Sequence, residues 1–404
     1  MKKTENTFQA APEIRPLGLY IHYPFCQERC FYCDFLTFPH AEALQAPYLS
    51  SLKQEIHLLD QAQGRQQMPF LAPVSYVVDT VYFGGGTPSL LPPEAVVSLL
   101  DALRAAFSFA KDVEITLEAN PGTLHRDGLA TLVAAGVNRV SLGVQSMSDT
   151  LLTRLGRTHT AADVTRDIAL LRETGVRNVN VDFLLGLPGQ SLEAIRRDLS
   201  FIEEWRPQHV SWYSLILEEK TYFSWQAQHG DLPLPEEALL LQEEEEVLNG
   251  LSALGYARYE ISNFALPSYA SRHNLKYWSA ADYLGIGVGA ASYLQGERYR
   301  NPAGIHAYGK EIAEGRLPQQ REERTLEEDL FEQVMMGLRK IQGIDRNAFY
   351  ARNGIDVLDM APKRIAEAQK NGLLCVTPTH IAFTPAGLNV QNDVLSDILW
   401  EWEG

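Results

Sequence analysis

Short apolar runs alternate with longer amphipathic stretches between residues 17 and 222. Apolar residues recurring at i, i+3 and i+4 predict a helix after each run, and glycines just past two of these helices predict their ends. The repeated alternation of strand and helix patterns predicts parallel βαβ units. The expected strands are 17–23, 78–85, 112–120, 138–145, 177–189 and 209–217, and the expected helices are 41–63, 93–107, 124–136, 161–175 and 191–205.

This pattern favours an α/β fold whose strands are covered by helices. The strands are nearly continuous apolar runs, as expected when helices cover one face and side chains fill the other. We expect a partial (β/α)6 barrel over residues 17–222, and a doubly wound open sheet is the alternative. Glu118, Gln145 and Asp182 lie near the carboxyl ends of expected strands. In β/α barrels that rim carries the functional site.

The pattern changes after residue 222, so we divide the chain into four parts. Residues 1–16 are expected to be a flexible polar tail, and residues 223–324 an α+β extension that begins with a long helix. The acidic run Glu243–Glu246 in that helix is interpreted as a solvated face. A helix at 326–341 and a hairpin at 373–384 predict a small winged-helix-like module over residues 325–404.

Charge and composition exclude several classes of protein. Asp and Glu number 51 against 35 Lys and Arg, and the formal charge of −16 argues against a nucleic-acid binder, which would usually carry a basic face. There is no run of 18 apolar residues, and the first residues lack the apolar core of a secretory signal. A cytoplasmic location is therefore expected.

Three of the four cysteines, Cys26, Cys30 and Cys33, fall within eight residues after the first expected strand. Clustered thiolates on a loop bind iron–sulfur clusters, and three ligands leave one iron of a cubane cluster open to a chelating small molecule. The alternative is structural zinc, which needs a fourth ligand such as His22 or Asp34. Cys375 is far away and is expected to be a small buried apolar residue.

The segment LYIHYPFCQERCFYCDF closely resembles the cluster loop of radical S-adenosylmethionine (SAM) enzymes, and more narrowly that of the oxygen-independent coproporphyrinogen III oxidase group. The resemblance runs from about residue 17 to residue 400. It implies a [4Fe–4S] cluster on Cys26, Cys30 and Cys33 whose open iron binds SAM. The other motifs stand in the family's order: YFGGGTPSLL, EITLEANPGT, GVNRVSLGVQS, LGRTH, VNVDFLLGLPGQ and HNLKYWSAADYLGIGVGA.

The resemblance also implies which residues contact SAM. From the residues alone, the glycine run could be a simple turn and the polar side chains could form rim salt bridges. Matched to the family's motifs, the SAM-binding positions are Tyr20, Tyr32, Gly85, Gly86, Thr87, Glu118, Gln145, Arg157 and Asp182.

A second group, His273-Asn274-x-x-Tyr277-Trp278, lies in the extension. An imidazole can ligate heme iron and aromatic rings can stack on a porphyrin, although a lone histidine is more often structural. The HNxxYW segment is typical of the heme chaperone (HemW) branch of the family, which makes His273 a candidate heme ligand. Arg258, Arg272 and Lys276 are candidate partners for the propionates.

Two departures from the oxidases indicate the chaperone branch. The oxidases share the pattern C-x3-C-x2-C-x-C, whereas here Phe35 stands at the position of the last cysteine. The oxidases also have a longer N-terminal segment. Ala291 departs from many members of the chaperone branch, in which histidine often stands at this position. We expect a protein that binds heme and transfers it to acceptor proteins, membrane-associated ones included, without coproporphyrinogen oxidase activity.

Three other functions stay open from the sequence. One is oxidative decarboxylation of coproporphyrinogen III, and another is anaerobic opening of heme by a radical SAM enzyme. The third is a zinc-stabilised barrel that only binds ligands. The C-terminal module is expected to cover the barrel mouth or to dock partners.

Overall fold

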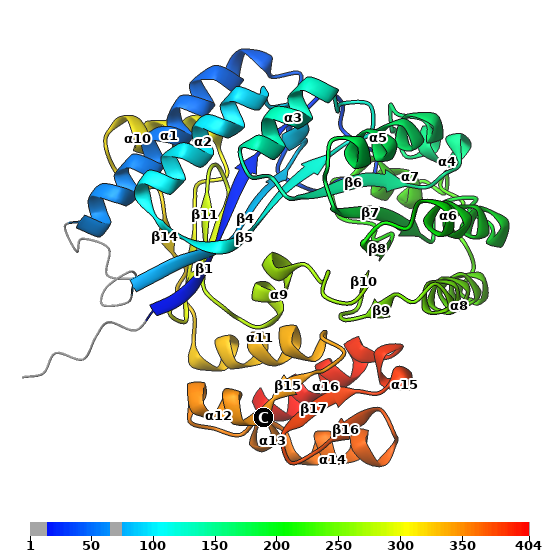
Figure 1. Cartoon of the computed structure of the whole chain (residues 1–404). Coiled ribbons are helices and arrows are strands. Elements are labelled where there is room, and N and C mark those ends of the chain that lie inside the picture. The colour runs from blue at the N-terminus through cyan, green and yellow to red at the C-terminus, as the bar shows by residue number, and fades with distance from the viewer. Residues whose placement is uncertain (1–13, 65–74, 404) are drawn as a thin grey trace, which may run out of the picture.

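Parallel strands joined by outer helices form the centre of the computed structural model, which describes residues 14–64 and 75–403 (Figure 1). The predicted alternation is confirmed, since each central strand pairs in parallel with the next. Within these ranges no helix has the length and apolarity needed to cross a membrane. The central elements are β1 (Ile14–Tyr23), α1 (Glu42–Gly64), β4 (Ser75–Gly85), η1 (Pro88–Leu90), α2 (Pro93–Ala106), β5 (Ser108–Ala119), α3 (Arg126–Ala134), β6 (Arg139–Gln145), α4 (Asp149–Arg154), α5 (Ala161–Glu173), β7 (Asn178–Leu185), α6 (Leu192–Trp205) and β8 (His209–Ser214).

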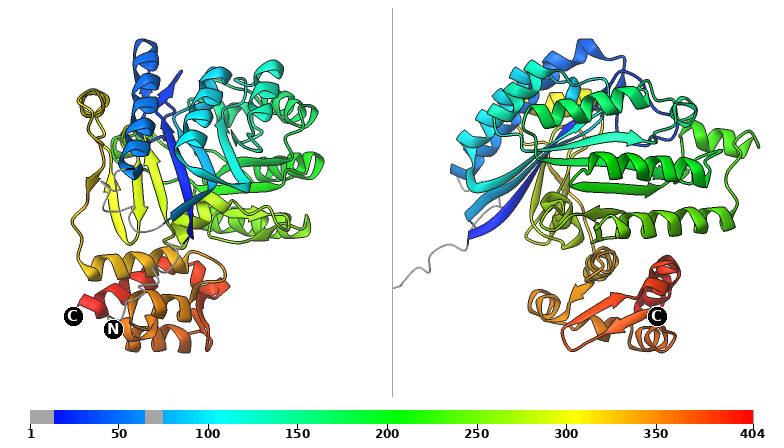
Figure 2. Two further views of the ribbon diagram at one scale, coloured as in Figure 1. Left: turned by 60° about the vertical axis from the view of Figure 1, so that its left-hand side comes forward. Right: turned by 45° about the vertical axis from the view of Figure 1, so that its right-hand side comes forward.

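The sheet is curved and open, so the partial barrel rather than the doubly wound sheet is confirmed. Its strand order is β14-β13-β12-β11-β1-β4-β5-β6-β7-β8-β10-β9. The connecting helices lie on its convex face (Figures 1 and 2). Leu17, Leu19 and Ile21 of β1 are fully buried in the same core as Leu52 and Leu59 of α1.

The extension adds strands to both edges of this sheet. Strand β11 pairs in parallel with β1, and β10 pairs antiparallel with β8. The short helix α9 lies on the opposite face of the sheet from α1, α2 and α3 (Figure 1). The extension contains α7 (Tyr222–Gln228), α8 (Glu237–Ala253), β9 (Ala257–Arg258), β10 (Asn263–Ala265), α9 (Arg272–Trp278), β11 (Tyr283–Ile286), β12 (Ala291–Leu294), β13 (Glu297–Arg300), α10 (Ile305–Ala313) and β14 (Gln320–Arg321).

Two sequence interpretations need correction here. Strand β1 begins at Ile14 and pairs with β4 from Ser75 onward, so residues 14–16 of the expected tail belong to the sheet. Backbone pairing does not require apolar side chains, which is why the pattern missed them; residues 1–13 lie outside the described residues. In α8, Glu243 is fully buried because the helical period places it on the same face as Val247 and Leu251.

The C-terminal module has a core of its own and the predicted wing. Strands β16 and β17 form the expected antiparallel hairpin, which pairs with β15. Cys375 is exposed rather than buried, because alternation along β16 turns it away from its buried neighbour Leu374. The module contains α11 (Leu326–Leu338), β15 (Ile344–Asp345), α12 (Arg346–Asn353), α13 (Val357–Met360), α14 (Pro362–Lys370), β16 (Leu374–Val376), β17 (His380–Phe383), α15 (Pro385–Leu388) and α16 (Gln391–Glu403).

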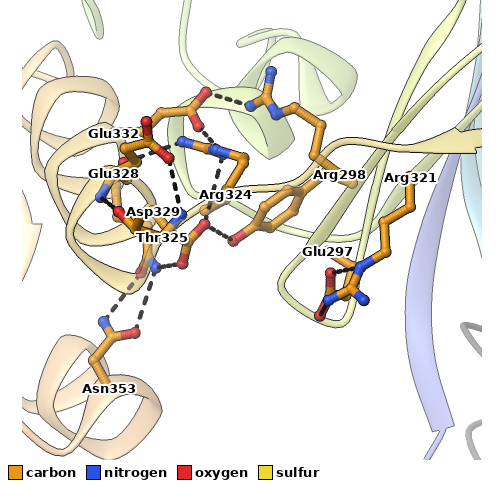
Figure 3. A network of polar contacts seen from close by, with 12 residues as sticks. Glu297, Arg298, Arg321, Arg324, Thr325, Glu328, Asp329, Glu332 and Asn353 are labelled. Atoms are coloured by element: carbon orange, nitrogen blue, oxygen red, sulfur yellow. Dashed lines mark hydrogen bonds and ion pairs between the residues drawn. The ribbon is translucent and has the colours of Figure 1, made fainter.

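A network of ion pairs fastens this module to the extension (Figure 3). Glu332 of α11 pairs with both Arg298 of β13 and Arg324. The Tyr293 hydroxyl of β12 donates to Asp329 of α11 at 3.3 Å. Charged groups on both sides of the contact therefore set the position of the module.

A buried carboxylate of the barrel is one of the points at which the extension is attached. Glu55 of α1 is fully buried and accepts four hydrogen bonds from the extension. The donors are the Gly287 backbone N–H at 2.8 Å, the Tyr308 hydroxyl at 2.7 Å, and the amides of Asn301 and Gln319 at 2.9 Å each. These contacts span more than 230 residues of sequence.

Replacing Glu55 by alanine should therefore destabilise the fold by about 3–5 kcal/mol, because four buried donors lose their acceptor. The measurement is denaturant unfolding followed by circular dichroism. Asp60→Ala, at an exposed position of the same helix, is the control and should change stability by less than about 0.5 kcal/mol. Equal stability of the two variants would contradict this role of Glu55.

Candidate functional site

A cavity of about 440 Å³ opens at the carboxyl ends of the central strands. It collects most of the residues that the sequence singled out, from the cysteine loop and from the strands β4 to β7. Tyr20 and His273 are not among the lining residues. The predicted residues that line it are Cys26, Cys30, Tyr32, Cys33, Gly85, Gly86, Thr87, Glu118, Gln145, Arg157 and Asp182.

The cysteine loop is held against the glycine segment by the backbone. The N–H of Gly86 donates to the Tyr23 carbonyl at 2.8 Å, and the N–H of Thr87 donates to the Phe25 carbonyl at 3.0 Å. Short strands β2 (Phe25–Cys26) and β3 (Phe38–Pro39) pair to close the base of the loop. The loop therefore presents its thiols to the cavity from a fixed base.

Gly86 is required for this close approach. A Cβ there would lie 2.7 Å from the Phe25 carbonyl oxygen and 2.9 Å from the Cys26 Sγ. Its neighbour Gly85 has φ +117°, a conformation that side chains other than glycine rarely adopt. The glycine run is therefore more than a turn, because it makes room for the cysteine loop.

The three cysteines are free thiols, and all of them are half-buried. Burial raises the pKa of Cys26, and it raises the pKa of Cys33 to about 11. Both thiols are therefore protonated at neutral pH until a cationic metal centre stabilises the thiolates. This donor set suits an iron–sulfur cluster, whose ligands are cysteine thiolates.

His22, one of the two residues that could complete a zinc site, is engaged within the fold. His22 donates from Nε2 to the Leu36 carbonyl at 3.0 Å and accepts at Nδ1 from the Tyr20 hydroxyl at 3.0 Å, so both ring nitrogens are occupied. Over the described ranges no three His, Cys, Asp or Glu side chains, the three cysteines included, are gathered into a group that could hold a metal ion, so the placement of the thiols does not by itself separate zinc from an iron–sulfur cluster. Tyr20 thus lies behind the loop, which it contacts through His22.

Glu118 is held on the far wall of the cavity. Its carboxylate accepts from the Tyr82 hydroxyl at 2.8 Å and from the Gly85 N–H at 3.0 Å. Burial raises the pKa of Glu118 to about 7, and the nearby charge of Asp182 contributes to the shift. Burial also raises the pKa of Asp182, which accepts hydrogen bonds from Ser141 and Asn180.

Arg157 connects the two sides of the cavity. One guanidinium nitrogen donates to the Tyr32 hydroxyl at 2.6 Å and the other to the Asn120 side-chain oxygen at 2.9 Å. Asn120 in turn donates to the Thr87 hydroxyl at 3.1 Å. Asn120 was not among the predicted site residues, because its bridging role depends on Arg157 and Thr87, which lie far from it in the chain.

Gln145 adopts an unusual backbone conformation at the end of β6. Its φ is +68°, and the pairing of β6 with β7 shifts register between Gly143 and Gln145. Non-glycine residues in this region are strained and are often found at functional sites. The bulge brings the buried Gln145 side chain to the cavity wall.

The structure does not bring the predicted heme-binding residues together at this cavity. His273 is fully buried, with Nδ1 2.8 Å from the Thr80 hydroxyl and Nε2 2.9 Å from the Tyr277 hydroxyl. Burial lowers the pKa of His273 to about 3, so the ring is neutral. With both nitrogens occupied, this arrangement does not fit an iron ligand.

The candidate propionate partners are also engaged within the protein. Lys276 pairs with Asp79 at 2.7 Å, Arg272 pairs with Asp112 at 3.2 Å, and Arg258 donates to the Ile261 carbonyl at 3.1 Å. Helix α9 is thereby fixed to the inner face of the sheet.

Comparison with known proteins identifies the families that this chain resembles. The family model "Radical SAM superfamily" matches residues 20–202, and "HemN C-terminal domain" matches residues 325–390. The chain is 36% identical to the heme chaperone HemW of Escherichia coli, over 96% of this chain and 100% of that protein. It is 34% identical to the HemW proteins of Lactococcus lactis and Bacillus subtilis, over 95% of this chain and 98% and 99% of theirs.

A solved structure shares the fold along nearly the whole chain. The coproporphyrinogen III oxidase HemN of Escherichia coli superposes with a TM-score of 0.79 and 25% sequence identity, over 96% of this chain and 91% of that one. This architecture is therefore shared with a radical SAM enzyme.

The variant Gly86→Ala should lower the iron and sulfide content of the anaerobically reconstituted protein, because the added Cβ pushes the Cys26 side of the loop away. A stability loss of about 1–3 kcal/mol is expected from the overpacking. Gly309→Ala is the control, since a Cβ at this position in α10 meets nothing within 4 Å. Full metal content in Gly86→Ala would contradict the role assigned to this contact.

Proposed function

The chain belongs to the heme chaperone HemW family, and from this membership we propose that it binds heme in the cytoplasm and transfers it to acceptor proteins while carrying a SAM-coordinated [4Fe–4S] cluster. The observation that carries the proposal is the convergence of the cysteine loop, the glycine segment and Glu118 on one cavity. Free thiols persist in a reducing compartment, which supports the cytoplasmic location. Acceptors, including membrane-associated ones, are part of the proposal.

Cys26, Cys30 and Cys33 would hold the cluster. When bound and reduced, a cluster of this kind supplies an electron to the sulfonium of SAM. The chain's residues would bind and orient the cofactor: Gly85, Gly86 and Thr87 form the cavity edge, and Glu118 and Asp182 offer carboxylates. Arg157 holds Tyr32 at the cavity, and Gln145 forms part of the cavity wall.

Tyr20 has an indirect part in this proposal. The Leu36 carbonyl at the end of the cysteine loop only accepts, so it fixes the proton of His22 on Nε2, and the Tyr20 hydroxyl donates to the other ring nitrogen. The loop is thereby kept in place from behind the cavity. The aromatic Tyr20 ring also stacks on Tyr82, the donor to Glu118.

The second candidate is coproporphyrinogen III oxidation, which the fold shared with HemN favours. Phe35 argues against it. The Phe35 side chain is 62% exposed and lies at the cavity. At this position of the sequence the oxidases share a further cysteine. An exposed phenyl ring offers an apolar surface and no thiol.

Anaerobic turnover separates the two functions. The reconstituted protein, given SAM, a reductant and coproporphyrinogen III, should leave all four propionates of the substrate intact, as read by mass spectrometry. Cys30→Ser provides the cluster-deficient background. Loss of two carboxyl groups in the wild type alone would make the protein an oxidase, whereas opening of added heme would make it a heme-degrading enzyme.

SAM binding should depend on pH through Glu118. The folded pKa of about 7 exceeds that of a free glutamate, so Glu118 is ionised above this pH and protonated below it. Affinity for the cationic cofactor, measured by calorimetry on the reconstituted protein, should fall several-fold between about pH 8 and about pH 6. Glu118→Gln should bind more weakly and show a flat profile, and a wild-type profile that is equally flat would refute this role.

A further inference from the structure

A row of exposed aromatic side chains lies beside the cysteine loop, and we call it the α7 patch. It consists of Phe31, Tyr222, Trp225 and His229. Phe31 is 37%, Tyr222 48% and Trp225 49% exposed. The ring centroids follow one another at 4.9 Å, 5.7 Å and 4.4 Å, so the four rings form one continuous surface.

His229 ends this row with a free ring nitrogen. Its Nδ1 lies 2.7 Å from the Trp225 carbonyl, and because a carbonyl only accepts, Nδ1 carries the proton. Nε2 therefore keeps its lone pair, and the exposed side chain presents it to solvent. A metal-ligating histidine is usually prepared in this way, with its other nitrogen donating to a carbonyl.

Three of the buried histidines use both ring nitrogens within the fold, and a fourth, His159, lies 3.2 Å from the Val144 carbonyl through Nε2 but is too buried to present its other nitrogen to a macrocycle at the surface. His273 and His22 use both ring nitrogens within the fold, and His209 bonds to Asn180 and Tyr259. His229 combines an oriented ring, a free nitrogen and stacked aromatic neighbours.

We propose that His229 is an axial ligand of heme iron and that the α7 patch binds the face of the macrocycle. This inference rests on the proposed heme-binding function. A bare metal ion needs several protein ligands, and the described residues hold no such group here. A metal that brings four equatorial nitrogens in a flat apolar ring needs a single axial imidazole, and because the Trp225 ring is tilted by only 32° from the His229 ring, it meets the macrocycle edge-on beside the imidazole.

The place of the patch in the fold supports transfer of the ligand. Helix α7 packs beside α4, where Phe223 joins Leu151 and Leu155 in one apolar cluster (Figure 1). The apolar cluster supports the row of rings from inside, and the outer surface of the row is exposed to solvent. Heme bound there stays accessible to an acceptor protein.

The patch is also joined to the cysteine loop. Phe31 follows Cys30 directly, and its carbonyl accepts from the Phe223 N–H of α7 at 2.9 Å. The N–H of Phe31 donates to the Leu155 carbonyl at 3.0 Å. The proposed heme site and the thiols therefore share one segment of backbone.

The test is titration of hemin into the purified full-length chain, followed by the Soret band and by electron paramagnetic resonance. The wild type should bind one hemin with an imidazole-ligated spectrum. His229→Ala should lose that spectrum and bind at least about tenfold more weakly, and added imidazole should restore the spectrum. Trp225→Ala should weaken binding but keep the ligand signature, because the imidazole remains.

His306→Ala, at an exposed position of α10 outside the patch, is the matched control and should behave as wild type. An unchanged spectrum and affinity in His229→Ala would overturn the inference while leaving the proposed function intact. Loss of the signal in a folded His273→Ala, with His229→Ala unaffected, would assign the iron to α9 instead. Absence of stoichiometric binding by the wild type would overturn the proposed function itself.

Discussion

Two backbone hydrogen bonds between the glycine segment and the start of the cysteine loop are the contacts on which the site depends. Parallel pairing of β1 with β4 sets Tyr23 opposite Gly85, and the bonds from Gly86 and Thr87 continue this register beyond the strands. Backbone pairing thereby fixes the base of the loop beside the glycine segment. The carboxylate wall is tied to the same place, since the Gly85 N–H donates to Glu118.

The barrel and the extension together bury the edge strands and the inner face of the sheet. An open sheet leaves its edge strands and its inner face exposed, and the extension covers both with β10, β11 and α9. Polar groups that become buried between the barrel and the extension form hydrogen bonds or ion pairs with each other, as Glu55 does with Tyr308 and Lys276 with Asp79. The extension is therefore part of the barrel's structure rather than a separate lobe.

The sequence predicted the central strands and helices because their apolar periods are long and regular. It predicted the cavity residues through short motifs whose positions at strand ends meet at one edge of a parallel sheet. The predicted exposure of Glu243 and the predicted burial of Cys375 were wrong, because each residue was interpreted without its position in the helical or strand period. The hydrogen bonds of His273 and the bridging role of Asn120 depend on residues far apart in the chain, which no local pattern contains.

The bond from Phe223 to the Phe31 carbonyl has a thermodynamic consequence. Phe31 adjoins Cys30, so a rearrangement of the loop when its thiols take up metal must also change the free energy of the rings on α7. Two binding events that share such a segment are linked, and linkage acts equally in both directions. With the proposed cluster in the loop and heme on the α7 patch, filling one of the two places would change the affinity of the other, and an acceptor would sense the state of the cysteine loop through the heme that it receives.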